Sequence, residues 1–226
     1  MPHLHTANFP SAHSNDAWYA RLERVLLYSV AVYCPGWTVS VDREAPAPCY
    51  SAQYHRGHEF NTQKDDSWRR AVQAAPDGAQ LMLIDVDAVV LGPLDGIWDR
   101  SFDVAYTVHR STIAGPPFNS GVLFVRVSPA VKAFFDAWNR ETHRLLLDPQ
   151  AHEPLRRVYR GIHQSALGSL MERGATAGID LQPVPCDEWN CDPAFDEFSD
   201  TTKVLHIKSG LRRAVFLGNR GYSDLV

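Results

Sequence analysis

Two carboxylates separated by one residue follow an apolar run in the middle of the chain. Residues 80–84 are Gln-Leu-Met-Leu-Ile, and Asp85 and Asp87 come directly after them. Side chains alternate between the faces of a strand, but the backbone turns where a strand ends, so both carboxylates can converge on one hard cation. This spacing indicates a divalent-metal site that handles a diphosphate. Aspartates that only end a strand and cap the next turn give the same pattern.

Alternating strands and helices must position these carboxylates. The residue patterns predict strands at 3–9, 37–41, 80–84, 102–107, 121–127 and 204–207, and helices at 14–33, 65–75 and 130–147. Asp65 and Asp66 are predicted to open the second helix, with Lys64 just ahead of it. Such alternation favours an α/β sheet approached through β-α-β units.

Length and composition bound the class of protein. The 226 residues suit one α/β domain spanning 1–226, and 22 Lys+Arg against 26 Asp+Glu give a net charge of -4 without a basic block. The longest apolar helical stretch, Val25–Cys34, is about half of a bilayer span, so no membrane anchor is predicted. The four cysteines lack a paired C-x-x-C arrangement and no leader precedes the domain, which predicts reduced thiols in a cytoplasmic protein. They are Cys34, Cys49, Cys186 and Cys191.

Four segments in one order resemble the glycogenin-like family 8 retaining glycosyltransferases of the GT-A fold, which include bacterial galactosyltransferases. They are Lys64–Trp68, Asp85–Asp87, Phe118–Val122, and Val204–His206 with Arg212 six residues beyond it. The resemblance covers Thr6 to about Phe216. It implies a single GT-A domain, a Rossmann-like nucleotide-diphospho-sugar transferase domain with a mixed central sheet flanked by helices.

The resemblance also implies roles for individual residues. Asp85, Asp87 and His206 would ligate Mn²⁺ or Mg²⁺ on the diphosphate of the donor, and Gln164, Asp87 and Arg212 would act in catalysis. The nucleotide would be bound by Thr6, Ala7, Asn8, Lys64, Val86, Gly210, Arg212 and Arg213, and the sugar by Lys64, Asn119, Ser120, Gly121, His163 and Gln164.

The chain departs from the family pattern at two places. Relatives carry Asp-Gln where this chain has His163-Gln164, so the choice of donor sugar stays open. Gly210 follows His206 at the fourth position and not the third, which predicts a reshaped loop. Trp189 and Asn190 fit a pocket wall or the core equally well.

The resemblance implies transfer of a sugar from a nucleoside diphosphate sugar, with a UDP-sugar as first choice, to a hydroxyl acceptor with retention of configuration. A saccharide, a protein side chain, a small metabolite and a modified DNA base all remain open as acceptors. An aspartate-nucleophile phosphohydrolase is an alternative, but its motif belongs near the N-terminus and a later acidic pair is absent. A catalytically impaired sugar-nucleotide binding module is another, because His163 replaces an acid.

Overall fold

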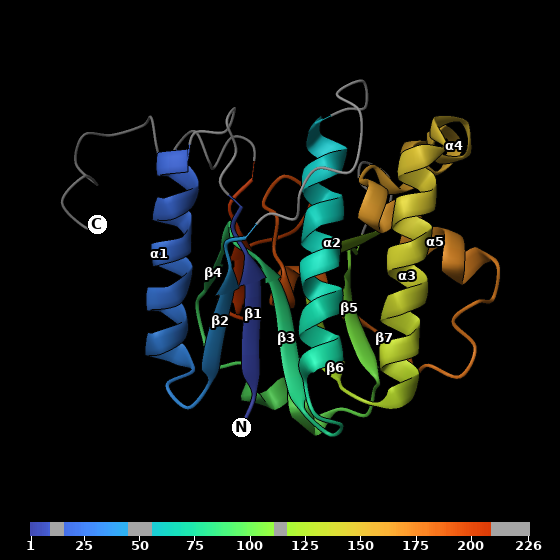
Figure 1. Ribbon diagram of the computed structural model, residues 1–226. Coiled ribbons are helices and arrows are strands. Elements are labelled where there is room, and N and C mark those ends of the chain that lie inside the picture. The colour runs from blue at the N-terminus through green and yellow to red at the C-terminus, as the bar shows by residue number, and fades with distance from the viewer. Residues whose placement is uncertain (10–15, 45–55, 111–116, 209–226) are drawn as a thin grey trace.

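A six-stranded mixed sheet forms the centre of the computed structural model, with helices on both faces (Figure 1). The structure describes residues 1–9, 16–44, 56–110 and 117–208. Its elements are β1 (His3–Ala7), α1 (Asp16–Tyr33), β2 (Thr38–Asp42), α2 (Arg56–Ala74), β3 (Gln80–Asp85), β4 (Ala88–Val90), the 3₁₀ helix η1 (Asp95–Asp99), β5 (Val104–Val108), β6 (Phe118–Arg126), α3 (Pro129–Leu147), α4 (Pro149–Tyr159), α5 (Ile162–Glu172), β7 (Leu181–Pro185), α6 (Cys186–Trp189) and β8 (Val204–His206).

The strand order β2-β1-β3-β6-β5-β7 places the end of β3 near the middle of the sheet. β1 pairs in parallel with both β2 and β3, in a register that aligns Ala7 with Asp42 and with Asp85. β6 is antiparallel to β3 and β5, and β7 is parallel to β5. The mixed sheet flanked by helices confirms the predicted fold class.

A separate two-stranded ribbon carries the C-terminal part of the site. β4 follows Asp87 directly and pairs antiparallel with β8, so that Ala88 lies opposite His206. The backbone N–H of Ile207 also donates to the carbonyl of Asp87 at 2.7 Å. The predicted strand at 204–207 therefore exists, but it joins β4 and not the main sheet.

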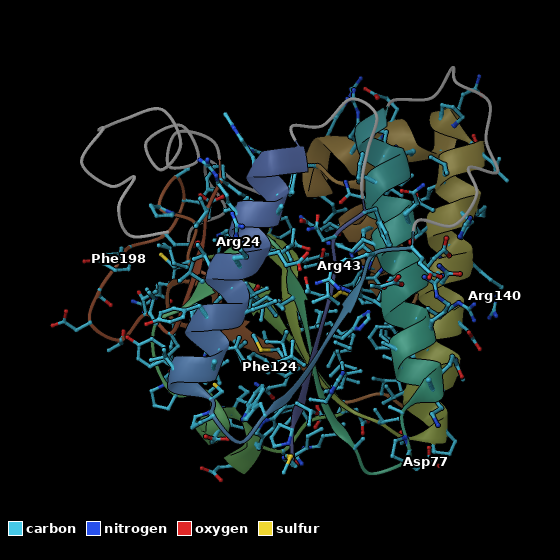
Figure 2. All side chains as sticks on the ribbon, turned by 60° about the vertical axis from the view of Figure 1, so that its left-hand side comes forward. Arg24, Arg43, Asp77, Phe124, Arg140 and Phe198 are labelled. Carbon is cyan, nitrogen blue, oxygen red and sulfur yellow. The ribbon has the colours of Figure 1, made fainter. Side chains whose placement is uncertain are left out.

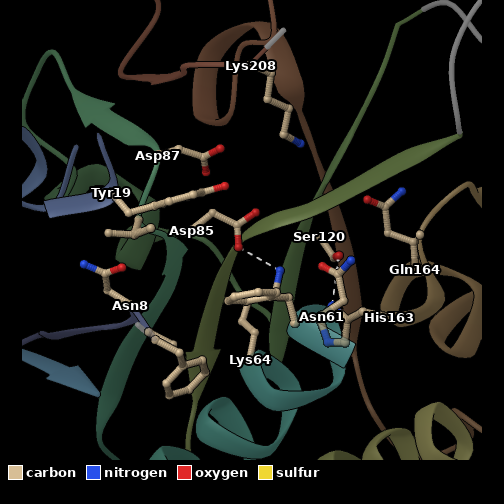
Figure 3. Close-up of a pocket in the computed structure, with 15 residues that line it drawn as sticks. Asn8, Tyr19, Asn61, Lys64, Asp85, Asp87, Ser120, His163, Gln164 and Lys208 are labelled. Carbon is tan, nitrogen blue, oxygen red and sulfur yellow. Dashed lines mark hydrogen bonds and ion pairs between the residues drawn. The ribbon is translucent and has the colours of Figure 1, made fainter. Parts of the chain in front are cut away.

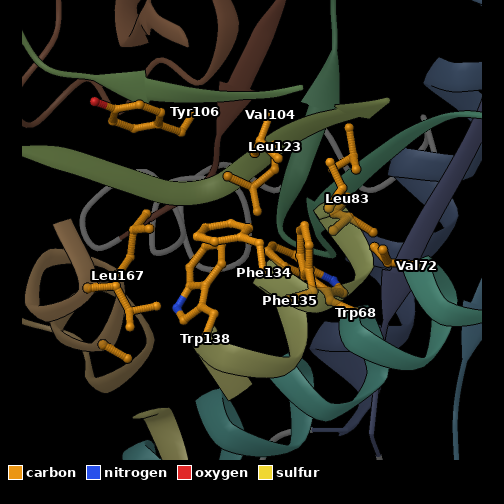
Figure 4. Close-up of a cluster of buried hydrophobic side chains, with 14 of the residues drawn as sticks. Trp68, Val72, Leu83, Val104, Tyr106, Leu123, Phe134, Phe135, Trp138 and Leu167 are labelled. Carbon is orange, nitrogen blue, oxygen red and sulfur yellow. The ribbon is translucent and has the colours of Figure 1, made fainter. Parts of the chain in front are cut away.

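The alternation of side chains along β3 divides the core into two clusters. Leu81 and Leu83 face α2, α3 and α5, in the cluster that Figure 4 shows around Trp68 and Trp138. Met82 and Ile84 face the opposite side, with α1, η1, α6 and the ribbon. Removing these apolar side chains from water stabilises the packing of the helices on the sheet.

Individual apolar side chains and cysteines differ in their exposure. Phe124 is fully buried in the interior behind α1 (Figure 2), whereas Phe198 is 57% exposed on a loop. Cys34, Cys186 and Cys191 are free thiols, as predicted for these three, and Cys49 lies outside the described residues. None of the helices in the described ranges is both long enough and apolar enough to cross a membrane.

Two local predictions are wrong. α2 begins at Arg56, so Asp65 and Asp66 lie well inside the helix and do not open it. Their short polar side chains look like helix caps in the sequence, but both accept hydrogen bonds from Asn139 on α3, at 3.0 and 2.8 Å.

The Asn119-Ser120-Gly121 segment, whose residue types favour a turn between two strands, lies within β6 and not ahead of the strand predicted at 121–127. The pairing of β5 with β6 is irregular here, between Tyr106 and Thr107. The Asn119 side chain accepts from the Gly121 N–H at 2.9 Å, a local hydrogen bond of the kind that this residue makes in turns. Residue types that favour a turn therefore produce an irregularity in the strand pairing beside the site.

Candidate active site

A pocket of about 450 Å³ opens at the carboxyl ends of β1 and β3 (Figure 3). Its size is that of a small-ligand site, and open α/β sheets bind ligands at this edge. Its lining residues are Ala7, Asn8, Phe9, Tyr19, Phe60, Asn61, Lys64, Asp85, Val86, Asp87, Ser120, Gly161, His163, Gln164 and Lys208.

Asp85, Asp87 and His206 converge at the wall of this pocket. One ligand atom of each lies within 4.8 Å of those of the other two. The Nε2 atom of His206 is 3.0 Å from an oxygen of Asp87 and 3.6 Å from one of Asp85. β3 and the turn after it supply the two carboxylates. The pairing of β4 with β8 places the imidazole of His206 beside Asp87, although 119 residues separate the two in the sequence.

A chain of hydrogen bonds behind His206 determines which ring nitrogen faces the carboxylates. Thr107 donates its hydroxyl proton to the carbonyl of Asn119 at 2.5 Å, so it accepts from the amide Nδ2 of Asn190 at 2.9 Å. The Oδ1 atom of Asn190 then faces His206 and accepts from its Nδ1 at 2.9 Å. In the neutral ring, Nε2 therefore carries a lone pair, directed at the two carboxylates.

This donor set fits a divalent cation. Two carboxylates and a neutral imidazole nitrogen suit Mn²⁺ and also accommodate Mg²⁺. An imidazole ligand whose other nitrogen donates to a neighbouring oxygen is the usual arrangement at metal sites. Without a cation, the lone pair of Nε2 would point at negative oxygens, so the arrangement favours a positive charge between them.

Gly121 allows this convergence, because an added side chain would occupy the same space. A Cβ on Gly121 would lie 2.4 Å from Cε1 of His206 and 2.9 Å from an oxygen of Asp85. The family resemblance implies that Gly121 contacts the sugar. In the structure, the groups that approach it closely are the imidazole and carboxylate themselves.

Two lysines supply positive charge at the pocket. Nζ of Lys64 is 2.7 Å from Oδ1 of Asp85 and 4.4 Å above the Trp68 ring, which leaves Oδ2 of Asp85 directed toward His206. Lys208 reaches into the pocket from the segment after β8 (Figure 3). Both ammonium groups can therefore contact an anion held near the carboxylates.

Gln164 lies in the first turn of α5 with its amide held in one orientation. Its Nε2 donates to the carbonyls of Phe118 and Tyr159, each at 2.9 Å. Both amide protons are thus used, and the oxygen is the polar atom that the side chain can direct into the pocket.

The structure brings most of the predicted site residues together. Ala7, Asn8, Lys64, Asp85, Val86, Asp87, Ser120, His163 and Gln164 line the pocket, while Asn119, Gly121 and His206 lie directly behind its wall. Thr6 is fully buried and is not among the residues that line the pocket. Gly210, Arg212 and Arg213 lie outside the described residues.

Sequence reasoning missed several contributors. Lys208 stands two residues after His206, and that proximity is a signal that could have identified it. Tyr19 and Phe60 line the pocket from α1 and α2, but an aromatic residue on a helix gives no distinguishing pattern. Thr107 acts only through Asn190, a relation that the linear sequence does not contain.

A second group of possible ligands, His109, Cys186 and Asp196, differs from the first in access. Nδ1 of His109 and Oδ1 of Asp196 are hydrogen-bonded at 2.7 Å, and these side chains are 1% and 2% exposed. Cys186 is fully buried, and burial raises the pKa of its thiol. None of these three residues lines the pocket described above. The Asp85–Asp87–His206 group is therefore the candidate site for a metal ion that also contacts a molecule bound in the pocket.

Comparison with known proteins identifies the fold. No family model matches the chain, and no curated protein matches it in sequence. A glycosyltransferase involved in the glycosylation of the major capsid of PBCV-1 superposes with a TM-score of 0.65 at 13% identity, over 93% of this chain and 95% of that one. The galactosyltransferase LgtC, solved with donor and acceptor sugar analogues, superposes with a TM-score of 0.52 at 12% identity, over 90% of this chain and 86% of that one.

The glycosyltransferase GlyE of Streptococcus pneumoniae gives a TM-score of 0.58 at 13% identity, over 92% of this chain and 55% of that longer one. At these identities the likeness concerns the fold. The chain has the GT-A-like fold of glycosyltransferases, with its carboxylate pair at the sheet edge where such α/β folds bind ligands.

Proposed function

We propose that residues 1–226 form a metal-dependent, retaining glycosyltransferase of the family 8 type. It transfers a sugar from a nucleoside diphosphate sugar, with a UDP-sugar as first choice, to a hydroxyl acceptor. The observation that carries the proposal is the convergence of Asp85, Asp87 and the Nε2 atom of His206 at one pocket of a glycosyltransferase fold.

The charges of the pocket support a diphosphate as the bound anion. Lys64 and Lys208 both line the pocket, and each can contact phosphate oxygens. Ala7, Asn8 and Val86 lie at the same sheet edge, where the rest of the nucleotide would bind. A divalent cation, Mn²⁺ or Mg²⁺, would neutralise the charge that develops on the leaving diphosphate.

The orientation of Gln164 supports retention by attack on the same face from which the diphosphate leaves. An amide is a poor nucleophile, but its oxygen can stabilise positive charge at the anomeric carbon. The two backbone carbonyls that hold Nε2 fix that oxygen as an acceptor. The acceptor hydroxyl would then enter beside the diphosphate, whose oxygen takes the proton.

A donor screen tests the proposal. UDP- and GDP-sugars are incubated with the protein and Mn²⁺, and release of the nucleoside diphosphate is measured, followed by mass analysis of products from an acceptor panel. The panel includes saccharides, peptides, small hydroxylated metabolites and DNA with hydroxylated bases. We expect slow hydrolysis of at least one donor without acceptor, stopped by EDTA.

The same screen, extended by a set of phosphate monoesters, separates the alternatives. Binding of a nucleotide sugar without turnover on any acceptor identifies an impaired binding module. Release of inorganic phosphate from phosphate monoesters, without turnover of nucleotide sugars, identifies a phosphohydrolase.

A further inference from the structure

His163, the residue at which the chain departs from the family pattern, is held rigidly in the interior. It is 2% exposed, and its ring stacks on Trp138 at 4.2 Å between centroids and 6° between planes. Trp68 packs edge-on against the same ring at 5.5 Å. The indole N–H of Trp138 donates to the backbone carbonyl of His163 at 2.9 Å. Because two indoles fix the ring plane, the directions of its two nitrogens are fixed as well.

One nitrogen of this ring faces a buried carboxylate. Nε2 of His163 lies 3.0 Å from Oδ1 of Asp65, with side chains 2% and 1% exposed. The contact falls short of hydrogen-bond geometry, and neither atom has another hydrogen-bond partner among the residues that the structure describes. Oδ2 of Asp65 accepts from Asn139 at 3.0 Å. A proton on Nε2 is attracted by the carboxylate, whereas a lone pair there would be repelled.

The other nitrogen faces Ser120 in the pocket wall. Burial lowers the pKa of His163 against the opposing effect of Asp65, so the ring carries one proton, and the carboxylate draws that proton to Nε2. Nδ1 then holds a lone pair 3.0 Å from Oγ of Ser120. Ser120 must donate its hydroxyl proton to Nδ1, which leaves its oxygen lone pairs for a ligand (Figure 3).

We propose that Asp65 and His163 are positioning residues that keep Ser120 as a hydrogen-bond acceptor toward the donor sugar, so that the wall formed by Ser120 and Gln164 binds a neutral sugar hydroxyl and disfavours a sugar carboxylate. This inference rests on the proposed function, because it assigns the chemical class of the sugar. Gln164 also presents an acceptor, because both of its amide protons are already donated to backbone carbonyls and only its oxygen remains. A uronate carboxylate on this wall would meet the acceptor atoms of Ser120 and Gln164, because Lys64 is paired with Asp85 and both lysines of the pocket are assigned to the diphosphate.

Nitrogen-15 NMR of labelled histidine tests the relay without any activity measurement. The His163 signal is assigned by its absence in His163→Phe, which keeps an aromatic ring against Trp138. We expect the neutral tautomer with the proton on Nε2 at neutral pH in the wild type. Asp65→Asn should change the His163 nitrogen shifts. Asp66→Asn is the matched control, because Asp66 also accepts from Asn139 but pairs with His143. A proton on Nδ1, or a doubly protonated ring in the wild type, would overturn the relay.

Calorimetry with Mn²⁺ tests the consequence for the sugar, using UDP-glucose against UDP-glucuronic acid and UDP-galactose against UDP-galacturonic acid. We expect the neutral member of the preferred pair to bind at least roughly tenfold more tightly. Ser120→Ala should weaken that binding by roughly five- to tenfold and leave binding of UDP alone unchanged.

The outcomes separate the two proposals. If neither UDP nor GDP binds in the presence of Mn²⁺, the proposed function is wrong. If UDP binds but the uronates bind as tightly as their neutral counterparts, or if Ser120→Ala changes nothing, the assignment of the acceptor wall is wrong.

Discussion

Replacement of Gly121 by alanine should damage the site through one atom. The added Cβ would lie 2.4 Å from Cε1 of His206, and ordinary van der Waals contact begins at 3.4 Å, so the ring must retreat by about 1.0 Å (3.4 − 2.4). His206 is fully buried and held by Asn190, so no open space receives it. Disturbing the support of a metal-binding imidazole costs about 10- to 100-fold in metal affinity, and a forced shift of about 1 Å lies at the upper end of that range. We therefore expect Gly121→Ala to weaken Mn²⁺ binding by about 100-fold, or ~2.7 kcal/mol.

Electron paramagnetic resonance of free Mn²⁺ measures this affinity directly. Overpacking should also destabilise the fold by about 1–3 kcal/mol, so the titration is made well below the melting temperature with circular dichroism as a check of folding. Gly96→Ala is the matched control, because a Cβ there meets nothing within 4 Å. The steric reasoning would be refuted if folded Gly121→Ala bound Mn²⁺ as tightly as Gly96→Ala does.

Four further substitutions test separate parts of the account. Asp87→Asn should keep the fold but lower turnover by at least roughly two orders of magnitude, ~3 kcal/mol, in a donor-hydrolysis assay with Mn²⁺; equal turnover would reduce Asp87 to a strand-end residue. Asn190→Leu should weaken Mn²⁺ binding by roughly 10- to 100-fold, and more than Asn190→Asp, which keeps an acceptor for Nδ1 of His206; equal effects in EPR titrations would contradict the tautomer argument. Gln164→Ala should lose roughly ten- to a thousandfold in rate and still give an α-linked product from an α donor, and a β-linked product by proton NMR would exclude front-face retention. Burial opposes ionisation of Glu141, but hydrogen bonds from α3 and α5 outweigh it and lower its pKa to about 2, so its stabilising effect is complete above about pH 4.5 and is lost as the pH falls toward 2. Glu141→Gln should therefore flatten the stability profile across that interval in denaturant titrations, and an unchanged profile would show that Glu141 is not responsible.

The local patterns in the sequence predicted the strands that carry the site, because a continuous apolar run such as that of β3 is typical of a strand buried on both faces. The grouping of His206 with Asp85 and Asp87 was implied by the family resemblance and not by any local pattern. The ribbon partner of β8 was missed, since pairing between segments more than 100 residues apart depends on tertiary packing and not on local propensity.

The hydrogen-bonded side chains behind the pocket could not be predicted from the sequence either. Asp65 looks like a helix cap, but α3 supplies the amide that binds it, and α5 supplies His163. Thr107 and Asn190 are ordinary polar residues until the fold brings them into one hydrogen-bonded chain with His206. Residue types thus predicted many of the groups that line the pocket, whereas the residues that orient those groups required the structure.

Metal-linked binding of UDP is the most direct test of the central claim. Calorimetry compares the wild type in Mn²⁺, the wild type in EDTA, and the double variant Asp85→Asn/Asp87→Asn in Mn²⁺. The account predicts binding of UDP only in the first case, because the cation joins the carboxylates to the diphosphate. Binding of equal affinity in EDTA or in the double variant, or no binding in any case, would contradict it.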